Sequence, residues 1–139
     1  MSGHKTLTMI KPVAFGKNYT GKILAKITEA GFTISAMKMT KLTIVQAQAF
    51  YNVHKERPFY NDLVEFMSSG PIVAAVLEKE NAVEEYRKVI GATNPENADK
   101  GTIRDLYGTS LQANAVHGSD SDENAEIEAS FFFSQLERF

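Results

Sequence analysis

The alternation of apolar and polar residues predicts three strands in the first 80 residues. Residues 6–10 are apolar and partly β-branched, and they stop at Lys11 and Pro12, where proline cannot continue a central strand. Residues 32–42 alternate, with a change of phase near Ala36 that predicts a bulge. Residues 71–77 are almost wholly apolar, which is typical of a central strand covered on both faces or of a strand in a subunit interface.

Helical spacing of apolar residues appears between these strands and after them. In residues 21–30 the apolar side chains Ile23, Leu24 and Ile27 share one face, and Gly31 ends the helix. Thr43 is expected to cap a helix that runs to about residue 55, and Pro58 separates it from the next helix. Further helices are predicted at 59–67, at 82–90, and from Asp120 or Ser121 to about residue 128.

The end of the chain and its longest loop complete the predicted order of elements. Phe131 to Phe133 are expected to form a fourth, aromatic strand, whereas residues 91–112 show no period and predict a long functional loop. Because single helical units separate the strands, a parallel doubly wound sheet fits less well than an antiparallel one. We expect one α+β domain over residues 1–139, a ferredoxin-like sandwich whose four-stranded antiparallel sheet is covered by helices on one face.

Composition removes several classes of function. The 139 residues contain no cysteine, which excludes disulfides, thiolate metal sites and a cysteine nucleophile. A net charge of -2 gives no broad positive field, so nucleic acid is not expected as a partner. There is no apolar leader and no run of the roughly 20 apolar residues that would cross a bilayer, so no membrane association is expected and the location is expected to be cytoplasmic.

Residues 114–121 are the strongest candidate for chemistry. Here His117 lies among amide, glycine, hydroxyl and carboxylate residues, and Glu128 could accept a hydrogen bond from one ring nitrogen. Gly118 would leave room for a bulky group, while Asn114 and Ser119 could bind an oxyanion. The alternative is a polar surface turn before a helix.

Three cations could supply a phosphate site around this histidine. Lys11, Arg87 and Arg104 lie at the ends of elements or in the long loop, and Thr93 is close to Arg104 in the sequence. Each could equally be an ordinary solvated charge. Together, two arginines and a lysine around a nucleophile describe a phosphoryl site. No Walker loop, dinucleotide fingerprint or metal-ligand motif occurs, so magnesium would arrive with nucleotide phosphates.

Four long segments resemble the nucleoside diphosphate kinase family: "TLTMIKP", "FYNVHKERPFYNDLVEFMSSGP", "YRKVIGATNPENADKGTIR" and "NAVHGSDS", in this order along the chain. The resemblance implies a ping-pong transfer of the terminal phosphoryl group of a nucleoside triphosphate to a nucleoside diphosphate, with Mg2+. It implies that His117 is phosphorylated and that Glu128 holds its ring, with Tyr51 and Ser119 beside them. The substrate-binding positions that match are Lys11, His54, Phe59, Leu63, Arg87, Thr93, Arg104, Leu111, Asn114 and Gly118.

Stacking of a base on Phe59 would read only its flat face, which predicts broad base tolerance. The sequence departs from the family pattern at Val13, Phe15 and Leu106, which we expect to tune stability or assembly and not activity. The family also implies a homo-oligomer built from dimers, and Pro95 favours a hexamer over a tetramer. Two rival functions stay open: an inactive nucleotide-binding relative, and a protein that passes phosphate from His117 to a partner protein.

Overall fold

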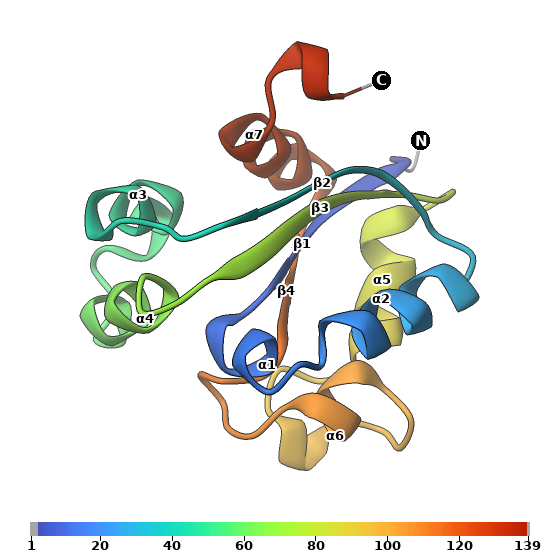
Figure 1. Cartoon of the computed structure of the whole chain (residues 1–139), viewed down its shortest axis with the longest axis horizontal. Coiled ribbons are helices and arrows are strands. Elements are labelled where there is room, and N and C mark those ends of the chain that lie inside the picture. The colour runs from blue at the N-terminus through green and yellow to red at the C-terminus, as the bar shows by residue number, and fades with distance from the viewer. Residues whose placement is uncertain (1–2, 139) are drawn as a thin grey trace.

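The computed structural model describes residues 3–138 and contains a four-stranded antiparallel sheet (Figure 1). The strands are β1 (Lys5–Ile10), β2 (Thr33–Thr40), β3 (Ile72–Glu78) and β4 (Val116–Gly118), in the spatial order β2-β3-β1-β4. Within β1, Met9 lies opposite Ala74 of β3 on one side and opposite His117 of β4 on the other. The predicted α+β architecture is therefore confirmed, and His117 lies on an edge strand beside a central one.

Seven α-helices and three single turns of 3-10 helix occur in residues 3–138. The helices are α1 (Pro12–Gly16), α2 (Thr20–Glu29), α3 (Ile44–Phe50), α4 (Tyr60–Met67), α5 (Ala82–Ile90), α6 (Ile103–Tyr107) and α7 (Asp122–Phe132). The turns are η1 (Asn52–His54), η2 (Pro95–Asn97) and η3 (Gln135–Glu137).

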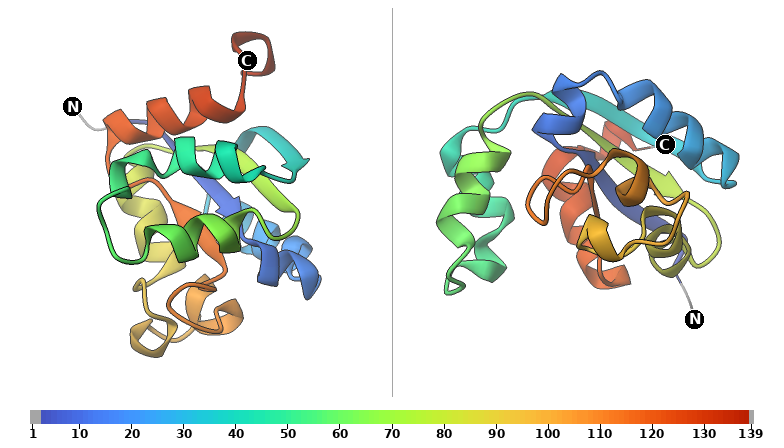
Figure 2. Two further views of the ribbon diagram at one scale, coloured as in Figure 1. Left: turned by 90° about the vertical axis from the view of Figure 1, so that its left-hand side faces the viewer. Right: turned by 90° about the horizontal axis from the view of Figure 1, so that it is seen from below.

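Helices cover both faces of the sheet, whereas the sequence predicted one covered face. Alternate residues of β3 explain the difference: Val73, Ala75 and Leu77 pack with α2 and α5, and the residues between them pack with α3, α4 and α7. The two groups of helices lie on opposite sides of the sheet in Figure 1, and Figure 2 shows the same layers from two other directions. Because both faces of β3 are buried, the strand needs apolar side chains at successive positions.

Local sequence signals predicted several details correctly. The pairing of β2 with β3 shifts between Ile34 and Ala36, which is the expected bulge. Thr43 caps α3: its Oγ1 accepts a hydrogen bond from the Gln46 amide at 3.1 Å, and the Gln46 side chain accepts one from the Thr43 amide at 2.9 Å. This reciprocal pair satisfies two amides that the first turn of a helix leaves without partners.

The prediction of a fourth strand at Phe131–Phe133 was wrong. Phe131 and Phe132 belong to α7, because Ala125, Ala129 and Phe132 recur at helical spacing and bury one face of that helix. The fourth strand is β4, only three residues long and with His117 and Gly118 in it, so it has too little alternation to be recognised. The helices α1 and α6 were also missed, since each has only five residues.

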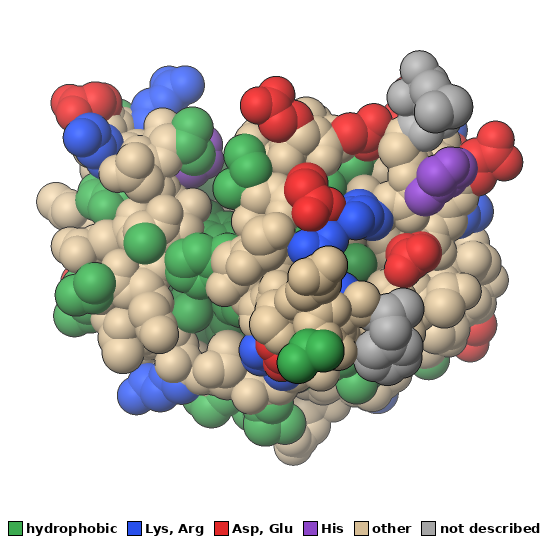
Figure 3. Space-filling model, turned by 90° about the horizontal axis from the view of Figure 1, so that it is seen from above, with side chains coloured by type: hydrophobic (Ala, Val, Ile, Leu, Met, Phe, Trp, Pro, Cys, Tyr) green, Lys and Arg blue, Asp and Glu red, His purple; other side chains and the backbone are tan. Residues whose placement is uncertain are grey.

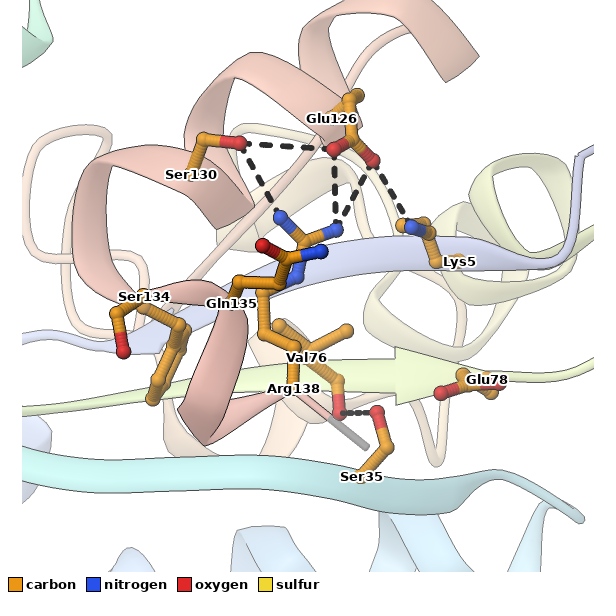
Figure 4. A pocket seen from close by; sticks show the side chains of 10 residues that line it. Lys5, Ser35, Val76, Glu78, Glu126, Ser130, Ser134, Gln135 and Arg138 are labelled. Carbon is orange, nitrogen blue, oxygen red and sulfur yellow. Dashed lines mark hydrogen bonds and ion pairs between the residues drawn. The ribbon is translucent and has the colours of Figure 1, made fainter.

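The segment after α7 folds back and binds to it (Figure 4). Arg138 contacts both carboxylate oxygens of Glu126, at 3.0 and 3.1 Å, and also donates to Ser130. Hydrogen bonds from Arg138 and Lys5 lower the pKa of Glu126 to about 2. A cavity of about 740 Å³ lies beside this network, but Arg138, Lys5 and Glu126 already pair with one another. No helix among residues 3–138 is long and apolar enough to cross a membrane.

Candidate active site

His117 is held by a carboxylate from α7. Its Nε2 lies 2.8 Å from Oε1 of Glu128, and both side chains are mostly buried, with 19% and 17% of their surface exposed. A carboxylate can only accept here, so the arrangement favours the tautomer with the proton on Nε2. Nδ1 is then the nitrogen with a free lone pair. The predicted pairing of His117 with Glu128 is therefore present, with Nε2 as the paired nitrogen.

Ser119 holds the Glu128 carboxylate that pairs with His117. Its fully buried hydroxyl lies 2.6 Å from the same Oε1 of Glu128, and it accepts a hydrogen bond from the Leu7 amide at 3.1 Å. The hydroxyl therefore donates its proton to Glu128, and none is left for a substrate oxygen. The sequence suggested that Ser119 could bind an oxyanion; the structure instead makes it a support for Glu128.

Tyr51 and an aromatic neighbour that the sequence missed complete the surroundings of His117. The Tyr51 hydroxyl is buried without a hydrogen-bond partner among the described residues, and burial and the Glu128 charge raise its pKa. Phe50 meets the His117 ring edge to face, with centroids 5.6 Å apart. Phe50 looks like an ordinary core residue in the sequence, so only the fold reveals this contact.

Lys11 and Asn114 form a second buried group. The Lys11 ammonium donates to Oδ1 of Asn114 at 2.8 Å, and the Asn114 amide donates to the Thr93 carbonyl oxygen at 2.9 Å. Burial, with a smaller contribution from the positive charge of Arg104, lowers the pKa of Lys11 to about 7. A buried lysine with this pKa gains from an anionic ligand, because the ligand stabilises the protonated form.

Arg104 lies beside a cavity of about 360 Å³ that Arg87 and Thr93 also line. Its guanidinium donates to the carbonyl oxygens of Gly91 and Val116, each at 3.0 Å, and its Nε is buried with no partner among the described residues. Burial lowers the pKa of Arg104 to about 10, so it still carries its charge at neutral pH. The structure thus brings together both arginines that the sequence singled out. Thr93 lines this cavity and also a neighbouring one.

A second cavity of the candidate site, of about 380 Å³, adjoins the cavity of Arg87 and Arg104, because Thr93 lines both. It is lined by Lys11, Phe59, Leu63, Thr93, Leu111, Gln112 and Asn114. Of these residues only Gln112 was not predicted. His54 lies next to it, with its ring 5.6 Å from that of Phe59 and 6.5 Å from that of Tyr51. An apolar end with Phe59 and Leu111 and a cationic end with Lys11 suit a ligand that has a flat ring and a charged tail.

The backbone around His117 is unusual at two positions. Ala115 has a φ of +75°, and the Val116 amide reaches back to the Asn114 carbonyl oxygen at 2.9 Å, a tight turn that costs conformational energy. A side chain on Gly118 would lie 3.0 Å from Ile90 and 3.1 Å from Tyr86. The glycine therefore allows β4 to pack against α5, whereas the sequence suggested room for a ligand.

The described part of the chain contains no cluster of three or more histidine, cysteine, aspartate or glutamate side chains that could hold a metal ion. The charged residues that line the two cavities are Lys11, Arg87, Lys88, Arg104 and one carboxylate, Asp99, so the excess of positive charge attracts phosphate oxygens more than a bare cation. These residues fit a magnesium ion only as part of a metal–nucleotide complex.

A four-stranded antiparallel sheet with a carboxylate-held histidine on an edge strand, and with two arginines and a lysine lining cavities of the same domain, suits a phosphotransferase. The sequence pattern of nucleoside diphosphate kinases matches residues 4–138. The nucleoside diphosphate kinase of Flavobacterium psychrophilum is 59% identical over all 139 residues and over its own full length, and that of Persephonella marina is 58% identical over 99% of this chain and 98% of its own.

Solved structures give the same result. The Aquifex aeolicus nucleoside diphosphate kinase is 49% identical and superposes with a TM-score of 0.95, covering 98% of this chain and 99% of that one. The Halobacterium salinarum enzyme, solved in complex with CDP, is 33% identical with a TM-score of 0.92, covering 97% and 90%. This chain belongs to the nucleoside diphosphate kinase family. It is an enzyme, and its fold is the ferredoxin-like fold of that family.

Proposed function

We propose that the chain transfers the γ-phosphate of a nucleoside triphosphate to a nucleoside diphosphate through a phosphohistidine on His117. The observation that carries this proposal is the 2.8 Å contact between Nε2 of His117 and Glu128. The cavity lined by Arg87 and Arg104 is linked to the same strand, because Arg104 donates to the carbonyl oxygen of Val116. A paired Nε2 leaves Nδ1 as a nucleophile, since a ring nitrogen must be unprotonated to attack.

In the first half-reaction the Nδ1 lone pair attacks the γ-phosphorus. A nitrogen–phosphorus bond forms, the bond between the γ-phosphorus and the bridging oxygen breaks, and the diphosphate leaves with that electron pair. The proton on Nε2 stays, and Glu128 stabilises the positive charge that develops on the ring. In the second half-reaction a terminal phosphate oxygen of a different nucleoside diphosphate attacks the phosphorus of the phosphohistidine. An oxygen–phosphorus bond forms, and the nitrogen–phosphorus bond breaks with its electron pair returning to Nδ1, so one site serves donor and acceptor in turn.

The cations would bind the phosphates, and the apolar end of the second cavity would bind the base. Arg87, Arg104 and Lys11 would neutralise negative charge on the transferring group, and a magnesium ion bound to the nucleotide phosphates would add to that neutralisation. Asn114 and Thr93 hold Lys11 in place. Phe59, Leu63 and Leu111 would contact the base through apolar surface, with His54 next to Phe59, so we expect broad base tolerance.

The assembly and the cellular location are proposed from the family resemblance. We propose one kinase domain over residues 1–139, a cytoplasmic location, and a homo-oligomer built from dimers, with the hexamer favoured over the tetramer. Pro95, in the turn η2, supports the hexamer through the resemblance alone. Light scattering at micromolar concentration checks the assembly, and a monomer mass would rule it out.

The proposed chemistry is tested by intact mass spectrometry. The protein is incubated with ATP and Mg2+ at neutral pH, measured, and measured again after GDP is added, with His117→Ala in parallel. We expect one added phosphoryl group that disappears with GDP and never forms in the variant. An adduct that GDP cannot discharge would indicate transfer to a partner protein, and the absence of an adduct would indicate a nucleotide-binding protein without transfer activity.

A further inference from the structure

The aromatic ring of Phe50 stands at the centre of a cluster that joins three elements around the candidate nucleophile. Its centroid lies 4.9 Å from that of Tyr51, 5.3 Å from Phe131 and 5.5 Å from Phe132, in addition to the 5.6 Å contact with His117. Phe50 ends α3, His117 lies on β4, and the two phenylalanines end α7. It is the only aromatic ring paired with the His117 ring among residues 3–138.

The surroundings of Phe50 are partly open. Phe50 is half-buried, and Phe131 keeps 39% of its surface exposed. Seen from above, the molecule is hollowed between the α3 side and α7, and hydrophobic side chains line this hollow (Figure 3). The Phe50 ring covers part of the His117 ring, and the His117 side chain keeps 19% of its surface exposed.

Hydrogen bonding alone does not fix the direction of the imidazole. The contact between Nε2 and Glu128 holds one nitrogen, but the ring can still tilt about that contact. The Phe50 ring meets the imidazole at an interplanar angle of 78°, a preferred geometry for aromatic pairs, and this restricts the tilt. The direction of Nδ1 follows from both contacts together.

We propose that Phe50 is a positioning residue that sets the plane of the His117 ring, so that Nδ1 points along the line of phosphoryl transfer. The inference rests on the proposed function, because it concerns the alignment of that nucleophile. Phosphoryl transfer depends on alignment more than on covalent help from the protein, and small misplacements of a reacting group reduce the rate strongly. Phe50 acts through His117 and does not line either cavity.

Three substitutions separate this role from a general role in packing. Phe50→Leu removes the ring but keeps apolar bulk, Phe50→Tyr keeps the ring, and Phe131→Leu removes a neighbouring ring that contacts Phe50 and not His117. The rate of phosphoenzyme formation from ATP is measured by rapid quench, together with the ATP concentration that gives half of the maximal rate. We expect Phe50→Leu to slow formation about tenfold at saturating ATP. Its half-saturating concentration, and both parameters of the other two variants, should stay within about twofold of the unmodified protein.

A second readout reports on the histidine itself. The 15N spectrum of His117 in the unphosphorylated protein should show the proton predominantly on Nε2, and Phe50→Leu should shift the ring resonances of His117, whereas Phe131→Leu should not. If Phe50→Leu does not fold, Phe50→Met replaces it. An unchanged rate and spectrum in Phe50→Leu, or an equal loss in Phe131→Leu, would overturn the inference while the proposed function stands. Failure of the unmodified protein to form a phosphoenzyme would instead remove the proposed function.

Discussion

The histidine end and the base end of the candidate site are built in opposite ways. At the histidine end, Glu128 receives two hydrogen bonds of 2.8 Å or shorter, and Ser119 is completely buried. At the base end, Phe59 is 48% exposed and Leu111 is 61% exposed. The histidine end is fixed by directional hydrogen bonds, whereas the base end offers exposed apolar surface that makes no directional contact.

This difference shows where the molecule can be selective. Hydrogen bonds that are buried and short reject a misplaced group, because a broken one leaves a polar atom without a partner. Apolar surface accepts any flat ring of about the right size. We therefore expect strict requirements at the phosphoryl group and loose ones at the base.

Breaking the histidine end should have the largest effect. Glu128→Gln removes the carboxylate charge but keeps the shape of the side chain. We expect kcat to fall about a hundredfold, since the ring loses both its preferred tautomer and the charge that stabilises its phosphorylated form. The kcat of the variant is measured in a steady-state assay of phosphoryl transfer from ATP to a nucleoside diphosphate.

Glu126→Gln is the matched control for that substitution. Glu126 lies two residues away on the same helix, but its carboxylate binds Arg138 and Lys5 and not His117. Its kcat should stay within about twofold of the unmodified protein. Equal losses in the two variants would mean that α7 is sensitive as a whole and that Glu128 has no special role.

Breaking the base end should act on substrate affinity instead. Phe59→Ala removes the ring at the mouth of the cavity, and we expect KM to rise about tenfold for every nucleotide with little change in kcat, because stacking is worth about 1–3 kcal/mol per base. Transfer assays with a purine and a pyrimidine donor check this. The nearby Val53→Ala, at a side chain that is 80% exposed, is the control and should change nothing. A KM that rises for one base only would mean that the base end is selective, contrary to this expectation.

The parts of the site differ in how far the sequence predicts them, and the reason is physical. The short polar segment around His117 and the cation Lys11 before a proline indicate chemistry in the sequence itself, and residue type was enough to expect the pairing of His117 with Glu128. Phe50 is different, because an aromatic residue at helical spacing predicts only burial. Its contact with His117 depends on how α3, β4 and α7 pack together.

The fold shows the same limit. The amphipathic helix predicted at residues 82–90 and the apolar strand predicted at residues 71–77 are recovered almost residue for residue. The three aromatic residues at 131–133 have a high preference for strands, but the helix that starts after Ser121 continues into them because Phe132 completes its buried face. Tertiary packing determines the secondary structure of such segments, and a single sequence does not reveal that packing.

Lys11 allows a measurement that sharpens the comparison at the boundary of the two ends. Its pKa is lowered from 10.5 to about 7 in the folded protein, so the protonated form is disfavoured and the resulting loss of stability is fully present below pH 7. This loss disappears as the pH rises from about 7 to about 10.5. A bound phosphate should raise the pKa again, so we expect an uptake of close to one proton per nucleotide near pH 8.

Calorimetry in two buffers of different ionisation enthalpy measures this uptake. Lys41→Met, at an exposed lysine, is the control and should take up as many protons as the unmodified protein. Lys11→Met should take up fewer. If the unmodified protein binds nucleotide without proton uptake at pH 8, Lys11 is already charged in the free site.

The smallest effect is expected at the strained residue before β4, and it tests whether strain or hydrogen bonding fixes the histidine end. Ala115 has a φ of +75°, which glycine adopts more easily, so Ala115→Gly should raise the free energy of unfolding by about 0.5 kcal/mol after the entropic cost of glycine. Ala113→Gly, two residues earlier and outside the positive-φ residues, should lower it. Thermal unfolding compares the two. Because Glu128, Ser119 and the pairing of His117 with Met9 all remain, kcat of Ala115→Gly should stay within about twofold. A large loss of kcat together with higher stability would show instead that the strained turn aims His117.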